Sequence, residues 1–293
     1  MNKENKFYRY LFHGKTKAEF VLYALIFLLF LLFALSYLYL LVWCLFAGLK
    51  THDELVMNAL ALPENWLFVN FVNVFHLIKY NDTTFMGMVF YSIYFSIFGA
   101  FLSTMSTCMI AYAATKYKFP GSRALFYCSL VMIVLPIYGS GGSQYKLLYN
   151  LGLINSPLMI ITSVGGLGMY FMYFNAFFKG LSWTYAEAAQ IDGANDFTVF
   201  FRVMFPQTRV LFGSLFLITM IGEWNNYGTA IIYLSKMPTL AAGLYLFKIQ
   251  MEFNAQLNYY YAACFLALLP MLLIFVAFNN AIMSNVSLGG IKE

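Results

Sequence analysis

Residues 182–206 read SWTYAEAAQIDGANDFTVFFRVMFP, a polar stretch between two apolar parts of the chain. Ser182 is a favourable N-cap, and the alanines that follow it favour helix. Gly193 stands where a helix can end in a left-handed residue, and Asn195 or Asp196 can cap a second helix. We expect Pro206 to end that second helix, because proline cannot continue a helix interior. The apolar stripe of the second helix consists of Val199, Phe200, Val203 and Met204. The stretch therefore predicts a helix, a glycine turn and another short helix.

The composition around this stretch is that of an integral membrane protein. Hydrophobic residues make up 62% and charged residues 10% of the 293 residues, whereas soluble domains carry roughly 25% charged residues. A chain in lipid must pair its own backbone groups, which helices do within each segment. We therefore expect an all-α integral membrane protein with one membrane domain.

Six segments are apolar enough to span a bilayer, so we predict six transmembrane helices. They are residues 20–47, 86–115, 124–138, 157–178, 210–231 and 260–283. The first is far longer than a signal-peptide core and should remain in the protein. The predicted layout is an N-terminal tail (1–19), a six-helix domain (20–283) with external loops at 48–85, 139–156 and 233–259, an internal loop at 179–207, and a C-terminal tail (284–293).

The distribution of basic residues predicts the orientation in the membrane. With both ends inside, twelve of the 17 basic residues lie on the inner side: Lys3, Lys6, Arg9, Lys15, Lys17, Lys116, Lys118, Arg123, Lys179, Arg202, Arg209 and Lys292. The longer outer segments hold Lys50, Lys79, Lys146, Lys236 and Lys248. Cytoplasmic loops are enriched in Lys and Arg, so the 179–207 loop and both termini should be cytoplasmic.

Several functions are disfavoured by the sequence. The net charge of +5 is scattered over segment ends and forms no basic patch for nucleic acid. The cysteines and histidines lack metal-ligand spacing, so we expect no metal site. They are Cys44, Cys108, Cys128, Cys264, His13, His52 and His76. The glycine-rich residues 139–143 lack the Gly-Lys-Ser/Thr of a P-loop, so we expect a flexible turn there and no ATP site in this chain.

The motif Glu187-Ala188-Ala189, followed by Asp192-Gly193-Ala194 and Phe205-Pro206, resembles the EAA loop of the membrane subunits of ATP-binding-cassette (ABC) importers. Four further motifs resemble the MalG-like permease subunit of carbohydrate importers: YKFPG at 117–121, LGLIN at 151–155, Trp224-Asn225, and GGIK at 289–292. The resemblance runs from about residue 86 to the C-terminus. Tyr185 and Gln190 stand where the family often has charged residues, and Phe205 replaces its usual leucine.

The resemblance implies a permease that imports a sugar, preferably an oligosaccharide, and that is a transport subunit and not an enzyme. It implies a second homologous permease subunit, an extracellular substrate-binding protein, and two ATP-binding subunits that hold the ATP and Mg²⁺. The implied location is the plasma membrane of a bacterium or archaeon. The 233–259 loop is the segment that the resemblance places nearest the binding protein.

The resemblance also implies two contact sites for the ATPase. The first is the 179–207 loop, with Tyr185, Glu187, Ala188, Ala189, Asp192, Gly193, Ala194 and Pro206. The second is the C-terminal tail, with Gly289, Gly290, Ile291 and Lys292. Alternatives are an amphipathic hairpin on lipid headgroups for the loop, and a frayed terminus for the tail.

Glu223, Trp224, Asn225 and Asn226 form a candidate substrate pathway within the fifth predicted span. An acidic residue in a span usually faces protein or water, so these residues can line a polar path on which sugar hydroxyls pair. In the other interpretation, Trp224 anchors the helix at the membrane interface and Glu223 is hydrated there.

Small residues recur along the second predicted span at Ser92, Ser96, Gly99, Ser103 and Ser106 or Thr107. They allow close helix packing, and a permeation surface is the alternative. For Pro270 in the last span we favour ordinary packing. The competing functions are a self-sufficient secondary transporter or channel, which would need repeats and a coupling-ion carboxylate, and an ABC importer for a non-sugar solute.

Overall fold

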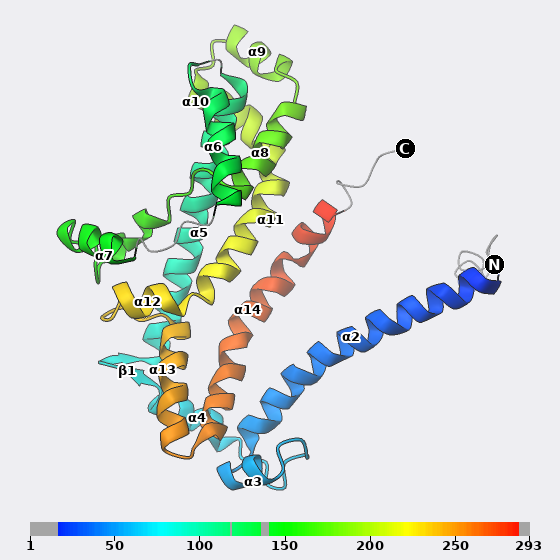
Figure 1. Cartoon of the computed structure of the whole chain (residues 1–293), viewed down its shortest axis with the longest axis vertical. Helices are drawn as coiled ribbons and strands as arrows, with labels where there is room; N and C mark the ends of the chain where they lie inside the picture. The colour runs from blue at the N-terminus through cyan, green and yellow to red at the C-terminus, as the bar shows by residue number, and fades with distance from the viewer. Residues whose placement is uncertain (1–16, 118, 136–140, 287–293) are drawn as a thin grey trace.

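The computed structural model describes residues 17–117, 119–135 and 141–286, and within them the fold is helical apart from one two-stranded hairpin (Figure 1). The first half consists of α2 (Lys17–Leu49), α3 (His52–Met57), α4 (Val69–Leu77), β1 (Lys79–Tyr80), β2 (Thr83–Thr84), α5 (Phe85–Lys116), α6 (Ser122–Val134) and α7 (Gly141–Asn150). The second half consists of η1 (Pro157–Ser163), α8 (Met169–Gly180), α9 (Thr184–Ile191), α10 (Asp196–Thr198), η2 (Val199–Met204), α11 (Phe205–Trp224), α12 (Tyr227–Tyr233), α13 (Leu240–Phe253) and α14 (Leu257–Val286).

Four helices in the described residues are long and apolar enough to cross a bilayer, at Val21–Leu49, Phe85–Lys116, Asp196–Trp224 and Leu257–Ile274. This confirms an all-helical membrane protein with several long apolar helices. α6 and α8 have 13 and 12 residues, fewer than the roughly 20 that a spanning helix needs. Six spans therefore remain a prediction.

The predicted helix at 157–178 is interrupted in the structure. Residues Pro157–Ser163 form a 3₁₀ helix, and α8 begins only at Met169. Between them, a Cβ on Gly165 would overlap the carbonyl oxygen of Ser103 and the hydroxyl of Thr107 on α5. The chain passes this close to α5 because glycine has no side chain. The length of an apolar segment in the sequence gives no information about such a contact.

The small residues of α5 take part in this close packing. The hydroxyl of Ser106 donates to the carbonyl of Gly165 at 3.0 Å, and the hydroxyl of Ser92 accepts from the amide of Leu240, the first residue of α13, at 2.7 Å. Ser96 and Thr107 are buried as well. These contacts support the packing interpretation of the stripe.

Other boundaries also differ from the sequence-based expectations. α11 ends at Trp224, seven residues before the predicted end at 231, because Asn226 starts a new helix by accepting the amide of Thr229 at 3.1 Å. Residues 141–143 form the first turn of α7 and not a flexible turn. The 233–259 loop contains the 14-residue helix α13.

Figure 1 shows how the long helices arrange the rest of the chain. α9 and α10 lie at one end of the bundle, and α3, α4 and the hairpin lie at the opposite end. α5 packs against both α8 and α11, while α14 packs against α2, α4 and α13. α2 leans away from the bundle, and its most apolar part has no buried residue.

Candidate functional site

The 179–207 loop begins with a short turn and the helix α9. The hydroxyl of Ser182 accepts from the amide of Thr184 at 3.2 Å, but Trp183 occupies the N-cap position. The prediction that Ser182 is the N-cap is therefore wrong by one residue. Its hydroxyl still binds one of the amides that lack a partner at the start of the helix.

The end of α9 is a Schellman motif with Gly193 in the left-handed conformation, at φ +85°. The amide of Gly193 donates to the carbonyl of Gln190 at 3.0 Å, and that of Ala194 to the carbonyl of Ala189 at 3.0 Å. Asn195 then caps α10, because its side-chain oxygen accepts from the amide of Thr198 at 2.8 Å. The structure thus contains the predicted helix, glycine turn and second helix.

Pro206 does not end the second helix, contrary to the prediction. Residues Val199–Met204 form a π-helical turn that leads directly into α11, and Pro206 lies in the first turn of α11. The amide of Phe205 donates to the carbonyl of Phe200, five residues back. The wider π turn relieves the clash that proline makes with the preceding turn of an α-helix, so the helix continues.

The two faces of this loop have different environments. Ala186, Val199, Phe200 and Met204 are buried against α5 and α8, and the predicted stripe residue Val203 is half-buried beside them. Of the predicted ATPase contacts, six side chains or backbone positions are exposed and two are half-buried. The exposed ones are Tyr185, Glu187, Ala188, Asp192, Gly193 and Pro206, and the half-buried ones are Ala189 and Ala194. One face of α9 is thus available to another molecule.

Two apolar residues on this exposed surface were missed by the sequence analysis. Ile191 is 86% exposed and Phe197 is 69% exposed. Neither residue belongs to the predicted apolar stripe. Their position outside that stripe, as large apolar residues in a polar segment, could have identified them from the sequence. Because exposed apolar side chains on a polar loop often mark contacts, we add both to the candidate surface.

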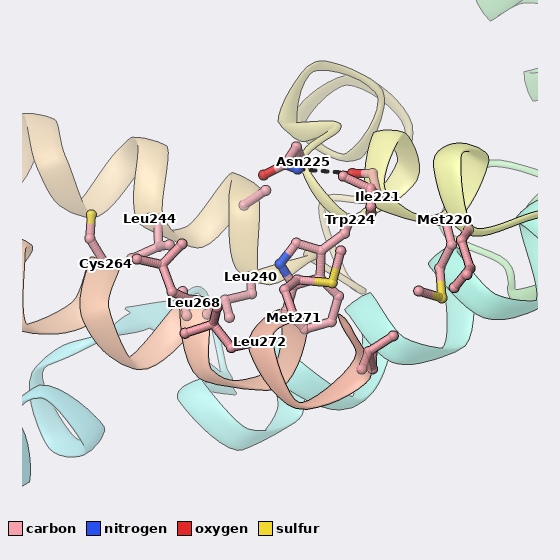
Figure 2. A pocket seen from close by; sticks show the side chains of 14 residues that line it. Met220, Ile221, Trp224, Asn225, Leu240, Leu244, Cys264, Leu268, Met271 and Leu272 are labelled. Carbon is pink, nitrogen blue, oxygen red and sulfur yellow. Dashed lines mark hydrogen bonds between the residues drawn. The ribbon is translucent and has the colours of Figure 1, made fainter. Parts of the chain in front are cut away.

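The four candidate pathway residues are divided between two cavities. Trp224 and Asn225 line a pocket of about 430 Å³ between α11, α13 and α14, whereas Glu223 and Asn226 line a cavity of about 40 Å³ near Thr229, on α12, and η1. In Figure 2, Trp224 lies among Leu240, Met271 and Leu272, and Asn225 donates to the carbonyl of Ile221 at 2.8 Å. A single polar lining from all four side chains is therefore not formed.

Trp224 is only 6% exposed and belongs to the same apolar core as Phe85, Met88 and Phe247. This burial does not fit an interfacial anchor, whose ring contacts the lipid headgroup region. Glu223 is half-buried beside residues that carry hydroxyl groups, including Ser163 and Thr239.

The predicted tail contacts Gly289, Gly290, Ile291 and Lys292 lie outside the described residues. Within the described part of the chain, no three His, Cys, Asp or Glu side chains lie close enough to hold a metal ion.

Known permease proteins are similar to this chain over most of its length. No protein-family model matches it. It is 26% identical to the diacetylchitobiose uptake system permease protein NgcG of Streptomyces coelicolor, over 85% of this chain and 82% of that protein. It is also 26% identical to the arabinooligosaccharides transport system permease protein AraQ of Bacillus subtilis, over 88% of this chain and 92% of that protein.

A solved structure shares the fold. One chain of a bacterial ABC transporter involved in the import of the acidic polysaccharide alginate superposes with a TM-score of 0.73, covering 91% of this chain and 98% of that one at 20% identity. The order and packing of helices described above are therefore those of a known membrane-transport chain.

Proposed function

We propose that this chain, a MalG-like permease subunit of a carbohydrate-uptake ABC importer, carries an oligosaccharide across a prokaryotic membrane. It is a transport component without catalytic activity or a cofactor of its own. Two of its relatives are named for the uptake of diacetylchitobiose and arabinooligosaccharides, which supports a short sugar chain as the solute. The observation that carries the proposal is the compact helical loop at one end of the apolar helices, with one face packed and one face exposed.

We infer that the energy for transport comes from partner proteins. The sequence has no P-loop, so a separate ATPase must hold ATP and Mg²⁺, and two copies would serve a pair of permease subunits. A second homologous permease would complete the path through the membrane. A substrate-binding protein would deliver the sugar from outside, near the 233–259 segment.

The exposed face of α9 is the proposed contact with the ATPase. Ala188 and Ala189 allow close approach of another backbone, and Glu187 and Asp192 supply charge at its edge. Gly193 and Ala194 fix the turn, and Tyr185, Ile191 and Phe197 add apolar contact area. Pro206 lies in the first turn of α11, so the loop is continuous with a long membrane helix. The tail residues Gly289, Gly290, Ile291 and Lys292 are proposed as a second contact.

The proposed topology has six spans and both termini in the cytoplasm. Its support is the excess of basic residues at the same end as the 179–207 loop. On this topology α6 and α8 also cross the membrane, although both are short. The residues before α8, including η1, form part of the same crossing as α8.

The test is co-purification from the native membrane in detergent, comparing wild type with Gly193→Pro and Gly152→Pro. Both glycines have a positive φ (+85° and +68°), which proline cannot adopt, and a Cβ added at either would meet no atom within 4 Å. Proline is therefore equally incompatible with the backbone at each position. We expect wild type and Gly152→Pro to bring down a second permease and an ATPase, and Gly193→Pro to retain only the permease. A wild-type chain that purifies alone and moves solute in liposomes would instead be a secondary transporter.

A further inference from the structure

Asp196 connects three elements at the inner end of the helix bundle. It is the first residue of α10, and its Oδ1 accepts a hydrogen bond from the hydroxyl of Tyr117 at 2.9 Å. The same oxygen accepts from the side-chain amide of Gln190, on α9, at 3.3 Å. Tyr117 follows directly after the last residue of α5. One carboxyl oxygen thus joins α5 to both helices of the 179–207 loop.

A second tether joins α5 to the start of the same loop. Nζ of Lys116, the last residue of α5, donates to the carbonyl of Leu181 at 2.6 Å and lies 6.0 Å from the ring centroid of Trp183. The rings of Trp183 and Tyr117 meet edge to face with centroids 5.9 Å apart. The loop is therefore bound to α5 both before and after α9, although α5 is remote from it in sequence.

Packing around the Tyr117–Asp196 bond is incomplete. A pocket of about 220 Å³ adjoins it, lined by Met109, Tyr112, Ala113, Phe197 and Phe200 in addition to the bonded pair. Tyr112 is 5% exposed, and its hydroxyl has no hydrogen-bond partner among the described residues. At this hollow the loop is held against α5 by the polar bonds together with the contact of the Tyr112 and Phe200 rings, whose centroids lie 5.0 Å apart.

The Tyr117 hydroxyl is suited to keep this bond. Partial burial raises the pKa of its phenol, and the neighbouring Tyr112 and Asp196 raise it further. The phenol stays protonated over the physiological pH range and remains a donor. Hydrogen bonds to an acidic side chain are stronger than those between neutral groups, more so where water is partly excluded.

We propose that Tyr117 is a positioning residue that makes α5 move with the 179–207 loop when an ATPase displaces it. The inference rests on the proposed function. The chain itself links the loop to α8 and α11, and the Tyr117–Asp196 bond adds α5, which packs on both of them. Without this bond, the displacement still reaches α8 and α11, while α5 follows only through the Lys116–Leu181 bond before α9 and its apolar contacts.

The experiment measures solute transported per ATP hydrolysed by the complete importer in liposomes with its binding protein. Tyr117→Phe removes one hydroxyl and keeps the ring contacts. We expect this ratio to fall about tenfold, the change that a lost hydrogen bond to a charged group produces. Co-purification of the ATPase and basal ATP hydrolysis should stay as in wild type, and the thermal midpoint should fall by no more than a few degrees. Tyr127→Phe is the matched control, because Tyr127 is exposed on α6 and makes no hydrogen bond in the described structure.

A second variant approaches the bond from the other side. Asp196→Asn weakens the acceptor and should also lower the ratio, and Tyr117→Phe combined with Asp196→Asn should be no worse than Tyr117→Phe alone. Wild-type ratios in both single variants would overturn the inference while leaving the proposed function intact. If the wild-type chain bound no ATPase at all, the proposed function itself would fail.

Discussion

Glu223 is an acidic side chain on a long apolar helix, half-buried beside Asn226 and the hydroxyl groups of Thr229 and Thr239. A cavity of about 40 Å³ has room for water but not for a sugar, so the space must widen in another state of the importer if a sugar passes here. This requirement makes Glu223 the most informative single residue of the proposed path.

We predict that Glu223→Ala lowers sugar uptake by about tenfold, because a hydrogen bond between a charged group and a sugar hydroxyl is lost. Basal ATP hydrolysis should not change. Uptake of labelled sugar by whole cells provides the measurement, with Glu64→Ala, which changes an exposed glutamate between α3 and α4, as the control. Normal uptake together with normal ATP hydrolysis would remove Glu223 from the path.

The sequence predicted residue roles best where the cause is local. The positive φ of Gly193 and the capping by Asn195 follow from residue chemistry within a few positions. The contact between Tyr117 and Asp196 was not predicted, because 79 residues separate them and only the packing of α5 against the loop brings them together. The burial of Trp224 was missed for the same reason, since its neighbours come from α5, α13 and α14.

At the scale of elements, α5 was predicted well from the apolar pattern of the sequence, whereas the junction of η2 with α11 was not. α5 spans Phe85–Lys116, within one residue of the predicted 86–115 at each end, because a long apolar run has few alternatives in lipid. The interruption of the predicted helix at 157–178 depends on the close approach of Gly165 to α5. The continuation of the helix through Pro206 depends on a π turn. Neither feature could be predicted from residue preferences, because the first depends on tertiary packing and the second on backbone geometry.

The π turn before Pro206 gives a prediction for this element. Pro206→Ala restores a backbone amide and allows residues 199–206 to relax toward a regular α-helix, which would rotate α9 relative to α11. We expect solute transported per ATP to fall, because α9 would no longer keep its orientation relative to α11. Pro157→Ala, at the start of η1, is the control. Equal ratios in the two variants would mean that the π turn has no part in transport.

At the scale of the molecule, the orientation of the bundle is open to direct measurement. In a chain whose four cysteines are replaced by serine, a single cysteine replaces either Ile191, the last residue of α9, or Leu60, which follows α3. α9 and α3 lie at opposite ends of the bundle, and both positions are well exposed. A maleimide that cannot cross membranes should label position 60 but not position 191 when added outside intact cells. After the cells are opened and the ATPase is stripped from the membrane, both should react. Labelling of position 191 from outside would invert the proposed topology.

The unbroken run from Asp196 to Trp224 has a mechanical consequence. Its 29 residues, at about 1.5 Å each, make a rod roughly 43 Å long that starts in the loop and ends beside Glu223. A tilt of about 5° about one end moves the other by about 4 Å, more than the diameter of a water molecule. The Tyr117–Asp196 bond lies at the loop end of this rod, so we expect the rod to act as a lever arm: a push at that end too small to unfold anything would open or close a passage at the other.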